Sequence, residues 1–486
     1  MNPHTARRFL SSLTLPLLVG LLADASPGQL PPGWWISSHH LSPTTSGPAG
    51  LWLHHPTGAV PSVAVSGLSG GLTGIGVISG GTGLPTAGAA SVTLCEATGT
   101  VVYVGEVVSS SADSLDLHRV TMAGTTVIAD VVVASIPAYP GTIRRISSLA
   151  PTSLGVSPAS EPYILMTIAG QPAGYPQLAV YHTFTGLSIV PTLFGMPPGT
   201  ATAVVYTQSY PSTTIAVVAG GTTTIVTVNI SFGAFSYQVS PVTTLATIPA
   251  SVAAMDYDAT TGLIYCACDG GAGALYTVNA ATGAVTALGG GGARRGIAWD
   301  ADTGTIATVG TGFAAFGTPL RSTMAGFTTV VTAPPAGGWG TPSGVDVQAA
   351  MRQLESGPTL STVDLRWNTP WTAAAAGVAN LPLSGNAGWG LSVSPSIFAP
   401  ITAFVGVSLA PSPFPIPFGV PPQFILIDLS PGSFLGVLPA SGFGVAALPF
   451  PIPPGFAGAE LWFQAVCSVA TVPDPILTDA MQVTIL

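Results

Sequence analysis

One motif has the form that serine hydrolases use. Gly67-Leu-Ser69-Gly-Gly71 matches G-x-S-x-G, which in those enzymes places the serine on a tight turn between a strand and a helix. No helical pattern follows it, and the surrounding stretch is rich in glycine throughout. We therefore expect a chance match and predict no catalytic residue in the chain.

Two pairs of histidines could supply metal ligands. His39 and His40 lie on one predicted strand, and His54 and His55 lie on the next. Adjacent residues of a strand point to opposite faces, so at most one member of each pair could face a common site. A hairpin with its loop at residues 41–50 would also keep His40 away from His54. We expect surface or interface histidines and no metal site.

Four aspartates could in principle bind calcium. They are Asp256, Asp258, Asp300 and Asp302, and they lack the D-x-D-x-D-G run with a distal glutamate. An aspartate at the start of a turn can accept hydrogen bonds from its own backbone, which explains their spacing without a metal. No metal and no cofactor are therefore expected.

The stretch from Gly289 to Gly296 is the one basic, glycine-rich loop. Backbone N–H groups and the guanidinium groups of Arg294 and Arg295 could hold a carboxylate or a phosphate. The interpretation that we favour is a linker whose arginines pair with the chain's own carboxylates, because nothing nearby completes a site. Arg294 and Arg295 are kept as candidate binding residues. The candidates for an exposed aromatic patch are Trp34, Trp35, Trp299 and Trp339, with burial in the core as the alternative.

The composition excludes several kinds of chemistry. All ten basic residues are arginine, and the formal net charge is -9. Without a lysine the chain can form neither a Schiff base nor a P-loop, and its negative charge argues against a nucleic-acid partner. The four cysteines are Cys95, Cys266, Cys268 and Cys467. Cys266 and Cys268 lie two apart on one strand, where a disulfide would strain the pleat, so we expect buried free thiols.

Residues 1–25 are predicted to be a secretory signal peptide. Arg7 and Arg8 precede a short apolar run, and Ala23-Asp24-Ala25 has the small-x-small pattern of a cleavage site. The apolar run is too short to span a bilayer, and no later run is long enough and free enough of glycine and proline for a membrane helix. We therefore expect an exported protein that is periplasmic, on the cell surface or extracellular, with no membrane span after cleavage.

Short antiparallel strands are the elements expected to position these residues. The stretch Met255–Leu288 contains four apolar strands separated by the turns D-A-T-T-G, D-G-G-A-G and A-A-T-G. Four strands in about 35 residues is the size of one propeller blade. Asp300-Ala-Asp-Thr-Gly304 repeats the first turn after about 42 residues, which is a typical blade period.

The chain is therefore predicted to be all-β. Residues 30–355 form a six-bladed β-propeller, or a seven-bladed one if residues 351–375 form a unit of their own. The first blade lacks a strand, and we predict that Ser343–Val347 supplies it and closes the ring, which removes exposed sheet edges. Residues 356–486 lose the turn motif and contain proline- and phenylalanine-rich strands, which predict a C-terminal β-sandwich.

The turns that begin at Asp258 and Asp300 resemble those of the NHL/YVTN/streptogramin-lyase-like superfamily of β-propellers. The resemblance covers roughly residues 30–350. The tail, especially Ala459–Ala465 and Met481–Leu486, resembles the C-terminal β-sandwich of large secreted bacterial proteins of unknown function. The resemblance implies the propeller fold and leaves the activity open, because the superfamily includes binders, lyases and lactonases.

The enzymatic sites of that superfamily do not transfer to this chain. A lactonase-like site gathers Glu, Asn and Asp around calcium, and only two asparagines, Asn229 and Asn279, lie in the blades. A streptogramin-lyase-like site needs a histidine and a glutamate near the axis, and His118 and His182 have no readable partner. We predict a secreted, non-catalytic propeller that binds or scaffolds a protein or glycan partner. The alternatives are a propeller hydrolase or lyase with an axial site, and a structural component of the cell surface.

Overall fold

The computed structural model describes residues 34–485, and its one described helix, α3 (Gly70–Thr73), has four residues. The signal peptide expected at residues 1–25 lies outside this part. Inside it, the following residues are also outside the description: 42–47, 55–61, 74–86, 95–100, 109–113, 138–142, 153–162, 172–176, 183–185, 191–192, 194, 208–211, 233–236, 259–260, 270–274, 290–291, 301–304, 311–319, 324–329, 332–339, 348–350, 355–362, 368–383, 386, 388, 396–399, 419–422, 444–445, 471–473 and 479.

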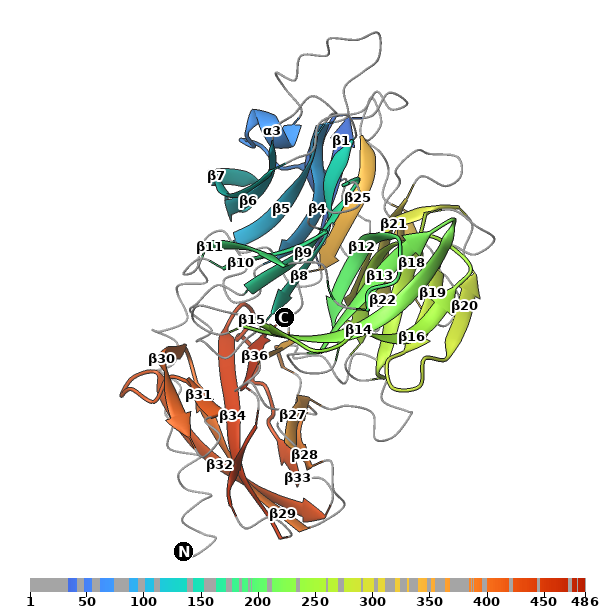
Figure 1. Ribbon diagram of the computed structural model, residues 1–486. Helices are drawn as coiled ribbons and strands as arrows, with labels where there is room; N and C mark the ends of the chain where they lie inside the picture. The colour runs from blue at the N-terminus through green and yellow to red at the C-terminus, as the bar shows by residue number, and fades with distance from the viewer. Residues whose placement is uncertain are drawn as a thin grey trace, which may run out of the picture.

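Successive groups of about four antiparallel strands make up the larger part of the chain (Figure 1), and pairing between strands joins the first three groups into one 12-stranded sheet. The first unit contains β1 (Trp35–Leu41), β2 (Gly50–His54), β3 (Val63–Ala64) and β25 (Thr341–Val347). The second contains β4 (Ala87–Leu94), β5 (Val101–Val108), β6 (Ser114–Ala123) and β7 (Thr126–Pro137). The third contains β8 (Arg144–Thr152), β9 (Tyr163–Ala169), β10 (Leu178–His182) and β11 (Gly186–Val190).

Three further units follow. The fourth contains β12 (Thr200–Tyr206), β13 (Ser212–Ala219), β14 (Thr222–Phe232), β15 (Tyr237–Val239) and β16 (Thr243–Ile248). The fifth contains β17 (Val252–Asp258), β18 (Leu263–Cys268), β19 (Leu275–Asn279) and β20 (Val285–Gly289). The sixth contains β21 (Arg294–Asp300), β22 (Thr305–Gly310), β23 (Leu320–Thr323) and β24 (Val330–Val331).

The innermost strands of these units form a closed ring, as in a β-propeller. Each innermost strand contacts the next one around the axis, in the order β25, β4, β8, β12, β17 and β21. The last of them, β21, contacts β25 again. Strand β25 pairs antiparallel with β1, from Trp35 opposite Val347 to His40 opposite Thr341. Figure 1 shows the orange β25 beside the blue N-terminal strands. The predicted closure of the ring by Ser343–Val347 is confirmed.

Each innermost strand contains an irregularity at the same place, followed by a small residue. The register with the second strand shifts once in every unit. The residues that follow the shift on the innermost strands are Ser91, Ser148, Ala203, Ala254, Gly296 and Gly344. Extra residues of this kind bend a strand and increase its twist. At Gly344 a Cβ atom would lie 2.8 Å from Ser38 Oγ and 3.0 Å from Ser91 Cα, so a side chain does not fit there.

Side chains on the innermost strands also bond to the backbone of the next unit. Ser91 Oγ donates to the Ile146 carbonyl at 2.8 Å, and Thr202 Oγ1 donates to the Val252 carbonyl at 2.6 Å. Carboxylates on these strands accept hydrogen bonds from backbone N–H groups of the neighbouring blade. Asp256 accepts from the Trp299 N–H at 2.6 Å, and Asp346 accepts from the Leu94 N–H at 2.7 Å. These bonds satisfy backbone groups that face a neighbouring sheet and fix each blade relative to the next.

A buried chain of histidines and serines lies at the closure of the ring. His39 and His54 each place Nε2 on Ser37 Oγ, at 2.7 and 2.6 Å. The other nitrogen, Nδ1, lies 3.3 Å from the Gly340 carbonyl in His39 and 2.7 Å from Ser62 Oγ in His54. A carbonyl only accepts, so His39 Nδ1 carries a hydrogen. Burial keeps both histidines neutral, so Nε2 of His39 is an acceptor and the Ser37 hydroxyl donates to it.

The expectation of surface histidines was therefore wrong. His39, His40 and His54 are buried, and His55 lies outside the described residues. Burial lowers the pKa of His39 from 6.5 to about 4 and that of His40 likewise to about 4. Burial also holds the pKa of His54 well below its ordinary value.

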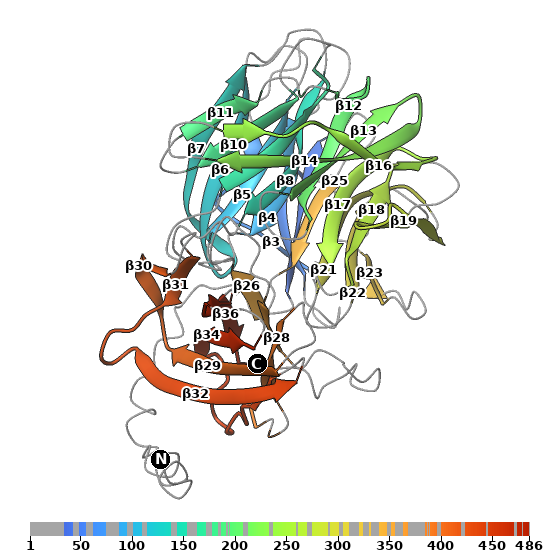
Figure 2. The same cartoon turned by 60° about the horizontal axis from the view of Figure 1, so that its bottom comes forward.

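The strands after residue 350 pair among themselves and form a second unit, which lies below the propeller in Figure 1 and in the turned view of Figure 2. Its largest sheet has the order β26 (Met351–Leu354), β36 (Ala480–Thr484), β34 (Glu460–Val469), β29 (Pro400–Ser408) and β32 (Phe434–Phe443), with β35 (Ile476–Leu477) against β34. The smaller sheets are β27 (Val363–Trp367), β28 (Gly390–Pro395) and β33 (Ala446–Pro449), and the pair β30 (Pro411–Phe418) and β31 (Gln423–Ile427).

One hydrophobic core joins the two larger sheets of this unit. It includes Leu391 of β28, Val405 of β29 and Phe463 of β34. Strands β26 and β27 pair with β36 and β28, so these strands do not form a separate blade of the propeller. The C-terminal sheets accordingly begin at Met351, ahead of the boundary expected at residue 356.

We predict that the change Gly344→Ala destabilises the propeller by about 1–3 kcal/mol, because the added methyl group overpacks the contact between β25, β1 and β4. Urea unfolding measures the free energy. The control Val63→Ala removes methyl groups from an exposed position on β3, and we expect a change of less than about 0.5 kcal/mol. Equal effects of the two changes would contradict close packing at the ring closure.

We also predict that the folded state loses stability between pH 6.5 and pH 4. Folding lowers the pKa of His39, so between pH 6.5 and pH 4 the unfolded chain binds a proton at His39 and the folded chain does not. Lowering the pH therefore stabilises the unfolded state relative to the folded state. By pH 4 this loss is on the order of 3 kcal/mol for His39. The variant His39→Gln cannot titrate, and urea unfolding at several pH values should show a shallower acid slope. An unchanged slope would argue against a neutral His39.

Candidate metal centre

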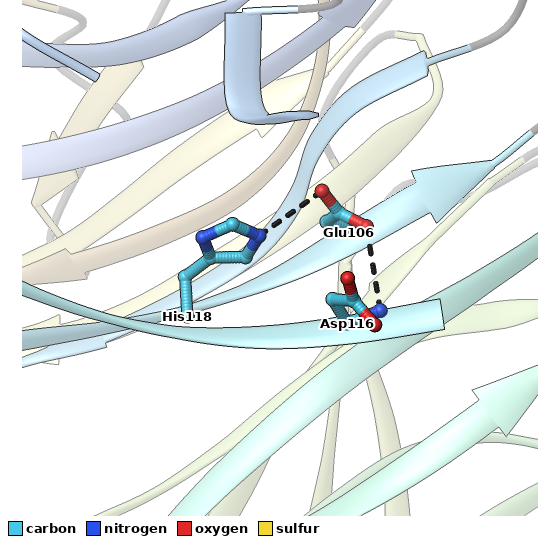
Figure 3. A group of neighbouring side chains, drawn as sticks. All are labelled: Glu106, Asp116 and His118. Carbon is cyan, nitrogen blue, oxygen red and sulfur yellow. Dashed lines mark hydrogen bonds and ion pairs between the residues drawn. The ribbon is translucent and has the colours of Figure 1, made fainter. Parts of the chain in front are cut away.

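Four ionisable residues from three neighbouring strands meet on one face of the second blade. Glu106 lies on β5, Asp116 and His118 lie on β6, and Asp130 lies on β7. Asp116 and His118 are two residues apart, so strand alternation puts them on the same face. Figure 3 shows Glu106 between the other two side chains that it draws. The antiparallel pairing of β5, β6 and β7 therefore brings these residues together from distant positions in the sequence.

His118 is held between two carboxylates. Its Nε2 lies 3.0 Å from Glu106 Oε1, and its Nδ1 lies 2.7 Å from Asp130 Oδ1. Glu106 Oε2 also accepts from the Asp116 backbone N–H at 3.3 Å, and Asp116 Oδ1 accepts from the Ser135 hydroxyl at 2.6 Å. The side chains of His118, Glu106 and Asp130 are all buried.

The electrostatics of the cluster follow from this pairing. Burial by itself acts to lower the pKa of His118, but the hydrogen bonds to Asp130 and Glu106 outweigh it and raise the pKa to about 9. Burial likewise opposes ionisation of Asp130, and the bonds from His118 and Ser69 more than offset it, so the pKa of Asp130 is lowered. At neutral pH the imidazole is therefore a cation that donates from both nitrogens.

Three of these residues have the spacing of metal ligands. One ligand atom each from Glu106, Asp116 and His118 lies within 4.8 Å of the other two. Asp130 holds the opposite ring nitrogen of His118, which is the position of the carboxylate that orients a metal-binding histidine. The arrangement can therefore act either as a structural ion-pair network or as a site for a divalent cation.

The G-x-S-x-G motif lies directly beside this cluster. The Ser69 backbone N–H donates to Asp130 Oδ2 at 2.8 Å, and α3 begins at the next residue. The expectation that no helix follows Ser69 was wrong, although the helix is a single turn. A Cβ atom at Gly71 would meet Glu106 Oε1, so a side chain there would displace the carboxylate. The segment therefore covers the cluster.

The candidate binding residues lie elsewhere in the propeller. Arg294 and Arg295 begin the innermost strand β21, so they are not in a loop. Arg294 is buried, and Arg295 Nε lies 2.9 Å from Asp269 Oδ2, as the linker interpretation predicts. Trp299 is half-buried and stacks on Tyr265 with ring centroids 5.0 Å apart. Trp339 lies outside the described residues.

The aspartates considered for calcium have structural roles. Asp258 accepts from the Thr261 hydroxyl, and the turn ends at Gly262 with φ of 69°. Asp256 bonds to the next blade, as described above, and Asp300 is buried at the end of β21. Asp302 lies outside the described part of the chain.

Three of the four cysteines lie in the described part, and each is a buried free thiol, as expected. Burial raises the pKa of Cys268 and of Cys467 to about 12 and that of Cys266 well above its ordinary value. Cys95 lies outside the described residues.

Sequence reasoning missed the cluster. His118 was expected to have no readable partner, whereas it pairs with Glu106 and Asp130. The signal present in the sequence is Asp116-Leu-His118 on one strand, with an acidic residue twelve positions before the histidine and another twelve positions after it. Two successive hairpins of equal length bring those acidic residues back to the histidine. His182, the other blade histidine, stacks on Tyr163 at 4.0 Å.

Comparisons with known proteins give similarity of fold only. No protein-family model and no curated protein matches the chain. Among solved structures, the chain is similar to one in a nidogen/laminin complex, with a TM-score of 0.43 and 11% identity over 65% of this chain and 100% of that one. TolB from Acinetobacter baumannii gives a TM-score of 0.43 and 13% identity over 65% and 66% of the two chains.

The β-propeller domain of Cps50 (Swd1) from Myceliophteria thermophila gives a TM-score of 0.31 and 10% identity over 55% of this chain and 92% of that one. All three scores are below 0.5, so the account of the fold rests on the strand pairing.

Within the described residues, no helix is both long and apolar enough to cross a membrane.

We predict that His118 makes stability fall on the alkaline side. Folding raises the pKa of His118 from 6.5 to about 9, so its contribution is complete below pH 6.5 and is lost as the pH rises through 9. His118→Gln should flatten this slope when urea unfolding is measured at pH 6.5, 8 and 9.5. The matched change His182→Gln should leave it in place. A slope retained in His118→Gln would show that another group causes it.

Proposed function

We propose that this chain is an exported, non-catalytic β-propeller that binds or scaffolds a protein or glycan partner. Export rests on the signal peptide predicted at residues 1–25. The C-terminal sheets would form a β-sandwich that serves for attachment or display. The proposal depends mainly on one observation: the histidines and cysteines among the described residues are buried.

The described Ser–His contact illustrates this burial. Ser37 lies 2.6 Å from His54, which is the spacing of a nucleophile and its base, but both side chains have an exposure of 0%. A substrate therefore has no path to the hydroxyl. The thiols are buried with raised pKa values, which disfavours the reactive thiolate.

His118 is likewise not a free general base. Both ring nitrogens of His118 donate to carboxylates at neutral pH, so the imidazole has no lone pair with which to accept a proton. Ser69 bonds to Asp130. These contacts support binding over hydrolysis or elimination as the function of the propeller.

The outermost strand of the second blade exposes apolar side chains on both of its faces. On β7 the side chains of Ile128, Val131 and Val132 are 68%, 51% and 47% exposed. Exposed apolar patches on a folded protein commonly mark interaction sites. We call these three residues the β7 surface and propose that the partner contacts it.

The test is binding by the chain from residue 26 to residue 486. A glycan array and chemical cross-linking on the producing cells would each report a partner. We expect saturable binding that the double change Ile128→Asp and Val131→Asp weakens at least tenfold, because two charges would be placed in an apolar contact. The control Val437→Asp makes the same kind of change at a 52% exposed valine of the C-terminal unit and should retain binding.

Two results would contradict the proposal. One is hydrolysis of an ester, lactone or glycoside by the purified chain that His118→Gln abolishes, since this would make the cluster catalytic. The other is an uncleaved N-terminus with retention of the chain inside the producing cells, which mass spectrometry and fractionation would detect.

A further inference from the structure

We propose that Glu106, Asp116 and His118 bind one divalent first-row transition-metal ion, with Asp130 and Ser69 orienting the histidine. The inference goes beyond the proposed binding or scaffold function and does not depend on it. It is argued from the ligand types, their separations, the outer hydrogen bonds and the charge of the cluster.

The separations suit a metal with little rearrangement. Ligand atoms about 2.1 Å from a tetrahedral zinc ion lie about 3.4 Å apart. His118 Nε2 and Glu106 Oε1 lie 3.0 Å apart, and the Asp116 carboxylate completes a set within 4.8 Å. Small side-chain rotations would therefore accommodate an ion among the three. Asp116 is only half-buried, which leaves a path for a fourth ligand such as water.

The outer contacts already hold the imidazole in the orientation that a metal requires. Asp130 accepts the Nδ1 hydrogen at 2.7 Å, and the Ser69 N–H fixes Asp130 in turn at 2.8 Å. These two hydrogen bonds leave Nε2 of His118 directed at Glu106. A carboxylate on the far ring nitrogen of a metal-binding histidine fixes the tautomer and raises the basicity of the ligand nitrogen. Pairing of His118 with Glu106 alone would not need this second carboxylate.

The acidic composition of the cluster also favours a cation. The groups that face His118 are Glu106 from β5, Asp116 from β6 and Asp130 from β7, and Ser69 bonds to Asp130. Three acidic side chains therefore surround one imidazole, with no basic side chain among these groups.

The ligand set points to a class of metal. Imidazole with carboxylates suits zinc and its first-row neighbours, whereas calcium and magnesium prefer oxygen ligands throughout. The covering segment adds a steric condition, because a side chain at Gly71 would displace the Glu106 carboxylate. Zinc is therefore the appropriate probe, with calcium as the comparison ion.

The experiment is calorimetric titration of the chain, without a polyhistidine tag and after dialysis against a chelator, with zinc chloride at pH 7. We expect saturable binding of one ion per chain. Calcium should bind at least a hundredfold more weakly.

Variants assign the ligands. Glu106→Gln and Asp116→Asn keep the size of each side chain and should each weaken zinc binding at least a hundredfold. Asp130→Asn should weaken it about 10- to 100-fold, as expected for a residue that orients a ligand. Asp428→Asn makes the same chemical change in the exposed turn at Ser430 of the C-terminal unit and should bind like the unaltered chain. Circular dichroism verifies that each variant is folded.

Two results would overturn the metal site. They are the absence of saturable zinc binding, and binding by folded Glu106→Gln that equals that of the unaltered chain. None of these results bears on partner binding by the β7 surface, so the two proposals fail independently.

Discussion

The close approach of the innermost strands around the axis is the constraint on which the rest of the propeller depends. Strands of adjacent sheets can meet there only where side chains are small, and Gly344 and Gly296 lie too close to neighbouring atoms to carry any. Ser91 supplies a hydrogen bond to the next blade in the same layer. A larger residue at one of these positions would force two sheets apart, and the ring would then fail to close on β25.

Closure in turn determines which polar groups are buried. The pairing of β25 with β1 buries Ser37, His39 and His54, which hydrogen-bond to one another. Burial penalises the imidazolium form and holds the pKa of both histidines low. Ring closure and the protonation state of these histidines are therefore coupled.

The second blade also buries a histidine, but in the cationic form. His118 is buried beside Glu106 and Asp130, so its cationic form is favoured where that of His39 is excluded. The difference comes from the partners: hydroxyl and carbonyl groups surround His39, whereas carboxylates surround His118. A site that holds excess negative charge beside an oriented imidazole is suited to a cation. The apolar β7 surface on the neighbouring strand is suited to a partner.

The sequence by itself determined the all-β class, the short strands, the turns and the pairing of the chain's two propeller ends. These features depend on the alternation of apolar and polar residues along the strands and on turn residues such as Asp258 and Gly262. They also depend on the predicted strand Ser343–Val347, which has no partner strand next to it in the sequence. Tertiary structure alone decided which side chains meet. The loop expected at Arg294 is the start of a strand, and His118 finds Glu106 and Asp130 through two hairpins. Hairpin register and burial depend on contacts between distant residues, which no local pattern specifies.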